Sequence, residues 1–504
     1  MDWFGFGWRA SKVSHKGKRR LAPVDKSAPE VIPDAEYELV IERVAAVDVA
    51  KAAGKVCVRL PAKAGRRISR VWDVPARTGA ISELGEQLVE LGVQKVTVES
   101  TSDYWRIWYY LLESAGLKVD LVNARDVKNV PGRPKTDKLD AVWLAKLTEK
   151  GLLRPSFVPP APIRRLRDYT RLREDLTHER TRYWQRLEKL LEDALIKVSV
   201  VASRLDTMST RDMIEALIAG ERDPRRLAEL ARGKMRAKRA DLITALDGRF
   251  DDHHADLARM LLAQIDALAA QINTLTGRIE DLIAELPGAA AVDHGGGEDA
   301  DTTAPGTGEG SDAGAQPDRG AAGLTGATPR RVDPVIEVEC ARLSAIERLD
   351  EIIGVGEHNA QVIIAETGLD MSRFPTPAHL VSWAKLCPRT IQSGPVTRGA
   401  KTGKGNPYLK GALGQAAAAA ARTDTFLGQR YRRIVKRRGK LKALVAVARS
   451  ILVVVWHLLS NPLARFCDLG SDYHTRRIDV ERRMRNHIAQ LTALGYRVTL
   501  EPAA

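Results

Sequence analysis

The first patterned part of the chain alternates between apolar strand-like runs and stretches with helical spacing. Residues 44–49 form a short apolar run, and residues 55–60 alternate apolar and polar positions as a half-buried strand does. Further strand-like runs cover residues 68–72, 95–98 and 117–122, and helical spacing covers residues 81–91, 104–112 and 137–147. Successive strands followed by strand–helix alternation predict an α/β domain with a mixed central sheet.

The middle of the chain predicts two long helices. The first covers about residues 162–200 and is rich in arginine; the second covers about residues 255–286. In the second helix the apolar steps alternate between four and three residues, a heptad repeat through Leu261, Ile265, Leu268, Ile272, Leu275, Ile279, Leu282 and Leu286. Such a repeat predicts either self-association through a coiled coil or an intramolecular hairpin with the arginine-rich helix.

A change of composition separates these helices from the C-terminal part. Residues 287 to about 331 are rich in Gly, Ala, Asp, Thr and Pro and lack hydrophobic periodicity, which predicts a flexible acidic linker. The apolar stretch Leu441–Leu459 is interrupted by Lys442 and Arg449, so it is expected to be a buried helix rather than a membrane span. The predicted domains are 1–38 (basic flexible tail), 39–160 (α/β), 161–286 (long helices), 287–333 (linker) and 334–504 (helical C-terminal domain).

The overall charge narrows the class of partner. Lys and Arg number 79 against 64 Asp and Glu, a formal net charge of +15, which favours a polyanion such as nucleic acid. The four cysteines are scattered without a Cys-x-x-Cys pair, which argues against a zinc ribbon or a disulfide framework. No apolar core of signal-peptide length occurs near the N-terminus. We therefore expect a cytoplasmic protein that is not inserted in a membrane.

Four acidic residues have the pattern of a two-metal site. Asp48 and Glu99 lie at the ends of predicted strands, and Asp137 and Asp140 lie three residues apart on a predicted helix. Carboxylates at strand ends can converge with a carboxylate pair on one helix face, and Mg²⁺ prefers such oxygen ligands. Two Mg²⁺ ions can stabilise the attacking and leaving oxygens of phosphoryl transfer. The basic residues Arg125 and Lys135 lie nearby in the sequence and could bind phosphates.

A serine in the C-terminal part is a candidate nucleophile. Ser393 stands in Gln-Ser-Gly and is followed by candidate phosphate-binding residues, namely Arg398, Lys401, Lys404 and Asn406. From the residues alone, this segment predicts only a turn, and the catalytic interpretation needs further context. Upstream, Gly354-Val-Gly356 resembles a helix–hairpin–helix, whose glycine turn would expose N–H groups to a DNA backbone. The alternative is a tight turn between packed helices.

Taken together, these motifs resemble the DEDD transposases of the IS110 insertion-sequence family, relatives of the Piv DNA invertases. The resemblance rests on Asp48, Glu99, the Asp137/Asp140 run, Gly354-Val-Gly356, Ala365-Glu-Thr-Gly368, Gln-Ser393-Gly and Lys404-Gly-Asn406. It implies an RNase H-like (RuvC-like) domain, long coiled-coil helices and a helical serine domain. It also implies that the four acids bind Mg²⁺ and that Ser393 forms a transient phosphoserine bond with DNA.

The resemblance further implies partners and a reaction. Members of the family use a structured guide RNA that pairs with target and donor DNA, and they act as dimers or tetramers in which one protomer's acids meet another's serine. We therefore expect an RNA-guided recombinase of a mobile element, associated with the bacterial nucleoid. The alternatives are a RuvC-like junction nuclease that uses water as nucleophile, and a nucleic-acid-binding scaffold without catalysis.

Overall fold

The computed structural model describes residues 41–62, 66–100, 102–124, 137–289, 343–388, 390–393, 396–399, 402–473 and 480–499. These residues fall into two compact units that divide between Pro159 and Pro160. The predicted basic tail and nearly all of the predicted acidic linker lie outside the described residues.

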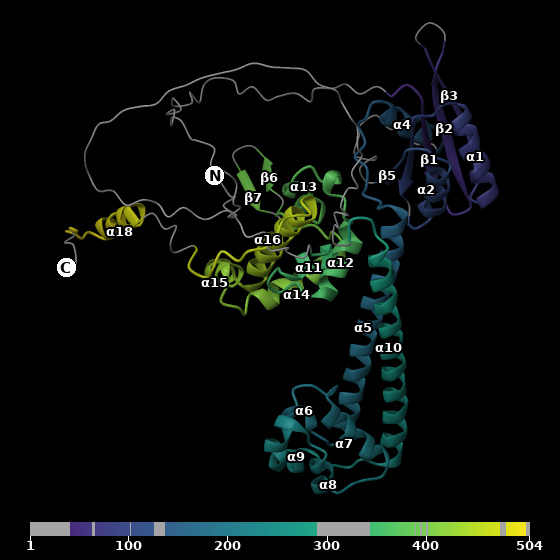
Figure 1. The fold of residues 1–504 in the computed structure, drawn as a ribbon. Coiled ribbons are helices and arrows are strands. Elements are labelled where there is room, and N and C mark those ends of the chain that lie inside the picture. Colours follow the sequence, from purple (N-terminus) through teal and green to yellow (C-terminus); the bar gives the residue numbers. More distant parts are fainter. Residues whose placement is uncertain are drawn as a thin grey trace, which may run out of the picture. The chain divides into compact units, whose positions relative to one another are not determined.

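The first unit is built on a five-stranded mixed sheet (Figure 1). Its strands are β1 (Val44–Val49), β2 (Ala53–Pro61), β3 (Arg67–Pro75), β4 (Lys95–Ser100) and β5 (Val119–Asn123). Their order is β3-β2-β1-β4-β5; β1, β2 and β3 are antiparallel neighbours, while β4 and β5 continue parallel to β1. This is the RNase H-like strand order, so the predicted mixed sheet is confirmed.

Helices cover both faces of this sheet. Successive side chains along a strand point to opposite faces, and each face packs in its own apolar cluster. Ala45 and Val47 pack in the cluster that includes α1 (Thr78–Glu90) and α2 (Trp105–Ser114). Ala46 instead packs in the cluster that includes α4 (Asp137–Glu149). Trp108 on α2 is fully buried, which confirms that this aromatic helix packs in the core.

The second unit contains a long helical hairpin made by α5 (Ala161–Asp193) and α10 (Asp252–Ala284), which lie side by side in Figure 1. The heptad residues Ile265, Ile272 and Ile279 are buried. The heptad repeat on α10 therefore packs against α5 of the same chain, which is the intramolecular hairpin that the sequence left open as an alternative. Self-association through this helix stays a prediction.

The prediction of one unbroken helix to residue 200 was wrong. Helix α5 ends at Asp193, and Leu195 adopts a positive φ of 60°. The Ala194 carbonyl accepts from the Arg249 N–H at 2.8 Å, and the Lys197 N–H donates to the Ala245 carbonyl at 2.7 Å. These long-range bonds stop the helix and draw the chain into a small domain at its end.

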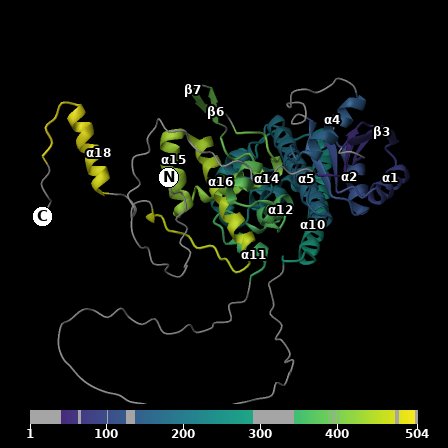
Figure 2. The ribbon, with the colours of Figure 1, turned by 90° about the horizontal axis from the view of Figure 1, so that it is seen from above.

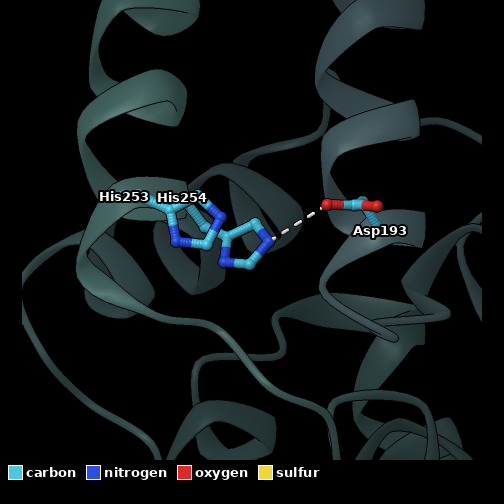
Figure 3. A group of neighbouring side chains, drawn as sticks. All are labelled: Asp193, His253 and His254. Carbon is cyan, nitrogen blue, oxygen red and sulfur yellow. Dashed lines mark hydrogen bonds and ion pairs between the residues drawn. The ribbon is translucent and has the colours of Figure 1, made fainter.

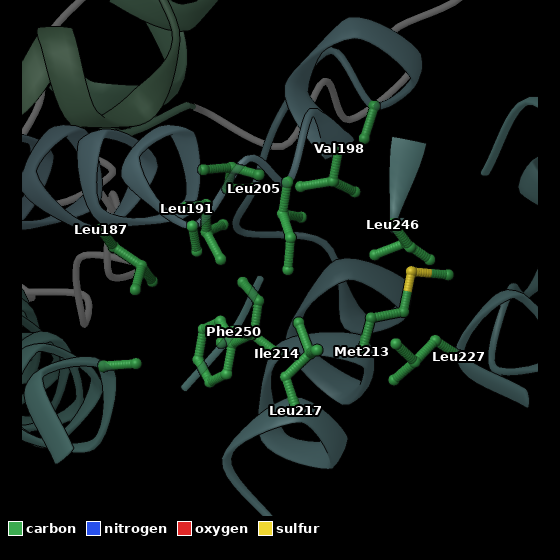
Figure 4. Close-up of a cluster of buried hydrophobic side chains, with 14 of the residues drawn as sticks. Leu187, Leu191, Val198, Leu205, Met213, Ile214, Leu217, Leu227, Leu246 and Phe250 are labelled. Atoms are coloured by element: carbon green, nitrogen blue, oxygen red, sulfur yellow. The ribbon is translucent and has the colours of Figure 1, made fainter. Parts of the chain in front are cut away.

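This distal domain holds five short helical segments between α5 and α10. They are α6 (Val198–Val201), α7 (Met208–Ile218), α8 (Pro224–Glu229), the 3-10 helix η2 (Gly233–Lys238) and α9 (Arg239–Ala245). Figure 4 shows its core, in which Leu191, Met213, Leu227 and Phe250 pack together from separate segments. The apolar residues were visible in the sequence, but their short segments lacked a periodicity long enough to predict this domain.

The C-terminal part of the second unit is helical with one short hairpin. Its elements are α11 (Ala345–Asp350), α12 (Glu357–Thr367), η3 (Met371–Arg373), α13 (Pro377–Trp383), β6 (Thr390–Ser393), β7 (Val396–Gly399), α14 (Pro407–Ala420), α15 (Phe426–Arg438), α16 (Lys440–Ser460) and α18 (Val480–Ala493). Helices α12, α14 and α16 lie together in Figure 2.

Helix α16 is long and apolar enough to cross a membrane when judged by length and composition alone. It packs against α13, α14 and α15, and half of its most apolar window is buried inside the protein. The prediction of a buried helix in this stretch is confirmed.

The glycine turn between α11 and α12 has a packing function. Gly354 adopts a positive φ of 90°, and a Cβ placed on it would lie 2.3 Å from the Ala416 carbonyl oxygen on α14. At Gly356, a Cβ would meet nothing within 4 Å. The tight-turn alternative therefore accounts for Gly354, while contact with a DNA backbone stays a prediction.

The two glycines form a matched pair for testing this packing. We expect Gly354→Ala to lower the free energy of unfolding by about 2–5 kcal/mol, because it combines a left-handed backbone with overlap against α14. Gly356→Ala should lower the free energy of unfolding by no more than about 1 kcal/mol, which is the difference between glycine and alanine at a helix N-cap. Urea denaturation of both variants measures the two values. Equal losses would show that the α14 contact does not restrict Gly354.

Candidate active site

Asp48 and Glu99 lie on neighbouring strands and on the same face of the sheet. Strands β1 and β4 are parallel, and Val47 lies opposite Val98. The next residue is Asp48 on β1 and Glu99 on β4, so these two acids are neighbours as well. Side chains alternate along a strand, which places these two acids on the face opposite the α1/α2 cluster. That face is the one covered by α4.

Helix α4 runs so that its first turn approaches the strand ends carrying these acids. At its far end, the Ile41 N–H before β1 donates to the Glu149 carbonyl at 2.9 Å. One residue before Glu149, the Thr148 hydroxyl donates to the Thr97 hydroxyl on β4 at 2.8 Å. The start of α4 therefore lies toward the carboxyl ends of β1 and β4.

The helix acids lie in this first turn. Asp140 is half-buried and shares a stripe at i, i+4 and i+8 with Leu144 and Thr148, which face the sheet. Asp137 is the first residue of α4, and its side chain is outside the described part of the structure. The fold thus brings Asp48, Glu99 and Asp140 to the same end and face of the sheet.

The chemistry of this end suits a hard divalent cation. Glu99 is only 5% exposed and Asp48 is half-buried, so carboxylate oxygens are held at a sheltered position. Mg²⁺ and similar cations prefer oxygen donors of this kind. At the opposite end of α4, by contrast, Glu149 pairs with Arg59 at 2.6 Å and with Arg67 at 3.0 Å, which is a structural role.

Ser393 is the last residue of β6 and lies in the second unit. The hairpin pairs Ser393 with Val396 and Ile391 with Arg398, so the serine stands beside the turn that joins β6 to β7. The side chains of Ser393 and Arg398, and the whole of Arg125, Lys135 and Lys401, are outside the described part of the structure. Lys404 is exposed after the hairpin.

Asn406, predicted as a nucleic-acid contact, has a structural role in the described structure. Its side-chain oxygen accepts from the N–H groups of Tyr408 at 3.0 Å and Leu409 at 3.2 Å, which caps α14. Its amide nitrogen donates to the carboxylate of Glu366. Asn406 therefore fixes the point where the hairpin segment enters α14.

Glu366 is the centre of a buried polar network that sequence reasoning missed. Its side chain is fully buried, and its two oxygens accept from Arg171 on α5 at 2.7 and 2.9 Å. Arg167 donates to the backbone carbonyls of Ala365 and Glu366 at 3.0 and 2.7 Å. Burial opposes the charge on Arg171, but Glu366 more than offsets that effect, and the pKa of Arg171 lies above its ordinary value.

The signal for this network was a carboxylate inside the otherwise apolar run Val362–Thr367. A charged residue in such a run requires a partner, but the partner is 195 residues away in the sequence. The sequence alone therefore shows that Glu366 is unusual without showing what it binds.

Breaking this network should be costly. We expect Glu366→Gln to lower the free energy of unfolding by about 3–5 kcal/mol, because it leaves the largely buried charge of Arg171 without its carboxylate. As a control, Glu179→Gln removes the partner of Arg182 in an exposed pair on α5 and should change stability by no more than about 0.5 kcal/mol. Urea denaturation compares the variants. Losses of similar size would contradict the role of Glu366.

A second group of potential metal ligands lies where the distal domain joins the long hairpin. Figure 3 shows Asp193, His253 and His254, whose ligand atoms lie within 4.8 Å of one another. However, Nδ1 of His254 accepts from the Asp251 N–H at 3.1 Å, so in the neutral ring Nε2 carries the proton and faces Asp193 at 3.4 Å. A metal ligand needs a lone pair on that nitrogen. We therefore interpret His254 as a helix cap.

Comparison with known proteins finds similarities in two parts of the chain. Residues 45–196 match the DEDD transposase model of the IS110 family, and residues 346–432 match the model for transposases of the IS116/IS110/IS902 family. Two parts of the chain are therefore similar to IS110-type transposases, which confirms the resemblance that the sequence motifs predicted.

One curated relative is an uncharacterized 43.6 kDa protein of the insertion element IS110 from Streptomyces coelicolor. It is 35% identical over 116 residues, and the match spans 22% of this chain and 28% of the relative.

Two solved structures of Thermus thermophilus RuvC, one of them in complex with a Holliday junction substrate, are similar to part of the chain. They are 17% and 18% identical and cover 23% of this chain and 99% of their own, with TM-scores of 0.18. The assignment of the RNase H-like fold therefore rests on the strand order and pairing, not on these likenesses.

Proposed function

We propose that this protein is a DNA recombinase that moves or inverts a mobile element through a transient phosphoserine bond. The observation that carries the proposal is the register of β1 and β4, which places Asp48 and Glu99 side by side on the sheet face covered by α4, the helix that carries Asp140. An acidic site for phosphodiester chemistry is the function this geometry supports best. The similarity of both parts of the chain to transposase families supports DNA as the substrate.

In the proposed reaction, the Ser393 hydroxyl attacks a DNA phosphate. The new Oγ–P bond forms as the bond from phosphorus to one deoxyribose oxygen breaks; the serine loses its proton and the departing oxygen gains one. The reverse reaction with a different DNA end restores the serine. Because each step exchanges one phosphodiester bond for another, strand joining needs no ATP.

Asp48, Glu99 and Asp140, with Asp137 at the start of α4, would hold Mg²⁺. When bound, the metal supplies positive charge that stabilises the attacking and leaving oxygens. The protein's own contribution is to keep the carboxylates fixed, which the β1–β4 pairing and the Thr148–Thr97 bond do. Lys404, exposed after the hairpin, would bind phosphate near the serine.

The proposal also includes a guide RNA and a composite site. The family resemblance supports an RNA that pairs with target and donor DNA. It also supports an assembly in which the acids of one protomer act with Ser393 of another.

A covalent-adduct assay tests the chemistry. Wild-type protein, Mg²⁺, DNA from the native locus and RNA from the flanking non-coding sequence should give a protein–DNA adduct that survives denaturant. Ser393→Ala should abolish the adduct, because the Oγ–P bond cannot form. Asp48→Asn or EDTA should reduce it by at least about 100-fold, because the charge that stabilises the transition state is lost.

Other outcomes of this assay separate the alternatives. Cleavage that persists in Ser393→Ala without an adduct would indicate a nuclease that uses water. Binding without strand breakage by the wild type would indicate a scaffold. An adduct that forms equally well without RNA would reject guidance while keeping the serine chemistry.

Mixing inactive variants tests the composite site. If acids and serine come from different protomers, Asp48→Asn mixed with Ser393→Ala should regain part of the adduct signal, carried by the Asp48→Asn chain. Asp48→Asn mixed with Glu99→Gln should stay inactive, because every set of acids is then defective. The same gel, with chains of different tag length, reads out which chain carries the DNA. No rescue in the first mixture would place the acids and the serine of one site in the same protomer.

A further inference from the structure

Helix α15 carries an unusual concentration of positive charge. Its 13 residues include Arg430, Arg432, Arg433, Lys436, Arg437 and Arg438, and the next helix begins with Lys440 and Lys442. One of these cations, Arg432, pairs with Asp424 at 2.8 Å. For Arg433, Lys436, Arg437 and Arg438, the described residues provide no ion pair.

Part of this charge forms a single cluster. Arg430, Arg433 and Arg437 are spaced i, i+3 and i+7 on one face of α15, and Arg449 lies on α16, which packs against α15. Arg430 is only 6% exposed, whereas Arg433 and Arg437 are exposed. The cluster thus rises from the protein interior to the surface. We refer to these four residues as the α15 arginine cluster.

The arginines of this cluster are close enough to repel one another. Burial, together with Arg433 and Arg449, lowers the pKa of Arg430 to about 10. Burial and the charge of Arg437 lower the pKa of Arg433. The guanidinium group is cationic in proteins, so like charges lie close together here, and a bound polyanion would reduce their mutual repulsion.

The structural explanation for basic residues on α15 is incomplete. Cations in the last turn of a helix interact favourably with its dipole, which accounts for Lys436, Arg437 and Arg438. The dipole effect is confined to that turn, so it does not explain Arg430 and Arg433. Nor does it explain why Arg449 of the neighbouring helix lies beside them.

We propose that the exposed face of α15, which carries Arg433, Lys436 and Arg437, binds the phosphate backbone of duplex DNA. The buried part of the α15 arginine cluster adds positive charge beneath this face. The exposed cations from Arg433 to Arg437 extend over about 6 Å of the helix, and the wide major groove of B-form DNA admits an α-helix. The corresponding groove of duplex RNA is too deep and narrow for such an approach.

The aromatic residues of α15 do not provide a platform for single-stranded bases. Phe426 packs edge-on against Tyr473, with ring centroids 5.1 Å apart, and Tyr431 is half-buried. Single-stranded RNA and DNA are typically bound by stacking on exposed aromatic rings. The chemistry of this face is therefore that of backbone contact. The proposal depends on the proposed recombinase function only for its partner and adds a DNA-holding surface to it.

Binding measurements on the full chain test this surface without requiring catalysis. The variant is the triple substitution Arg433→Gln, Lys436→Gln and Arg437→Gln. The matched control removes three exposed cations from the distal domain, by Arg225→Gln, Lys234→Gln and Arg236→Gln. Fluorescence anisotropy with a fluorescein-labelled DNA duplex of arbitrary sequence gives the dissociation constant over a range of KCl concentrations, and thermal unfolding checks that each variant is folded.

We expect the α15 variant to weaken duplex DNA binding by at least about tenfold. The slope of log K against log salt should fall by about 3, because each of the three substituted cations no longer neutralises a phosphate. The control should leave both values near those of the wild type. A charge-retaining variant, Arg433→Lys with Arg437→Lys, should keep most of the binding.

Two results would overturn the proposal. Equal weakening by the α15 variant and the control would show only the effect of net charge. Loss of binding to an RNA duplex of the same sequence, with DNA binding unchanged, would assign the surface to RNA. The proposed function can fail independently: DNA binding that depends on α15 with no Ser393 adduct would keep this surface and reject the chemistry.

Discussion

The buried carboxylate of Glu366 joins parts of the second unit that are far apart in the sequence. It binds Arg171 on the long helix α5 and Asn406 at the start of α14, while the main chain beside it accepts from Arg167. Removing a carboxylate and guanidinium from water is costly, and the bidentate geometry compensates only when all partners are in place. The network therefore specifies one arrangement of α5, α12 and α14.

This arrangement is important for the segment that carries Ser393. That segment is a two-stranded hairpin of four residues per strand, and an isolated hairpin is at best marginally stable by itself. It enters α14 through Asn406, whose side chain both caps the helix and binds Glu366. The start of α14, which follows the hairpin in the sequence, is thus tied to α5 through Asn406 and Glu366.

The acidic site depends on a different kind of constraint. Parallel pairing of β1 and β4 places Asp48 and Glu99 side by side, and α4 is held over them by Leu144, Ala145 and the Thr148–Thr97 hydrogen bond. Backbone register and apolar packing fix this geometry, so the acids need not contribute to stability. The α15 arginine cluster is the opposite case, because there the fold retains charges that oppose one another.

The sequence by itself determined the elements with strong periodicity and the residue types with unusual positions. The strand–helix alternation of the first unit predicted its mixed sheet, which the structure confirms. The acids at strand ends indicated where such side chains can converge, and their role as a metal site stays a prediction. Short segments with little periodicity, such as the distal domain, were missed. The heptad repeat was compatible with packing against a second chain or against α5, because an apolar stripe does not specify its partner. In the structure it packs against α5.

Only the tertiary structure decided the roles that depend on distant partners. Gly354 packs against the backbone of Ala416, Asn406 caps a helix rather than standing free, and Glu366 pairs with an arginine 195 residues away. From the local sequence, Gly354 could equally belong to a DNA-binding turn and Asn406 could be an exposed amide. The local sequence likewise does not show which residue pairs with the charge of Glu366. Local sequence fixes which conformations a segment favours, whereas contacts between segments are set by the packing of the whole chain.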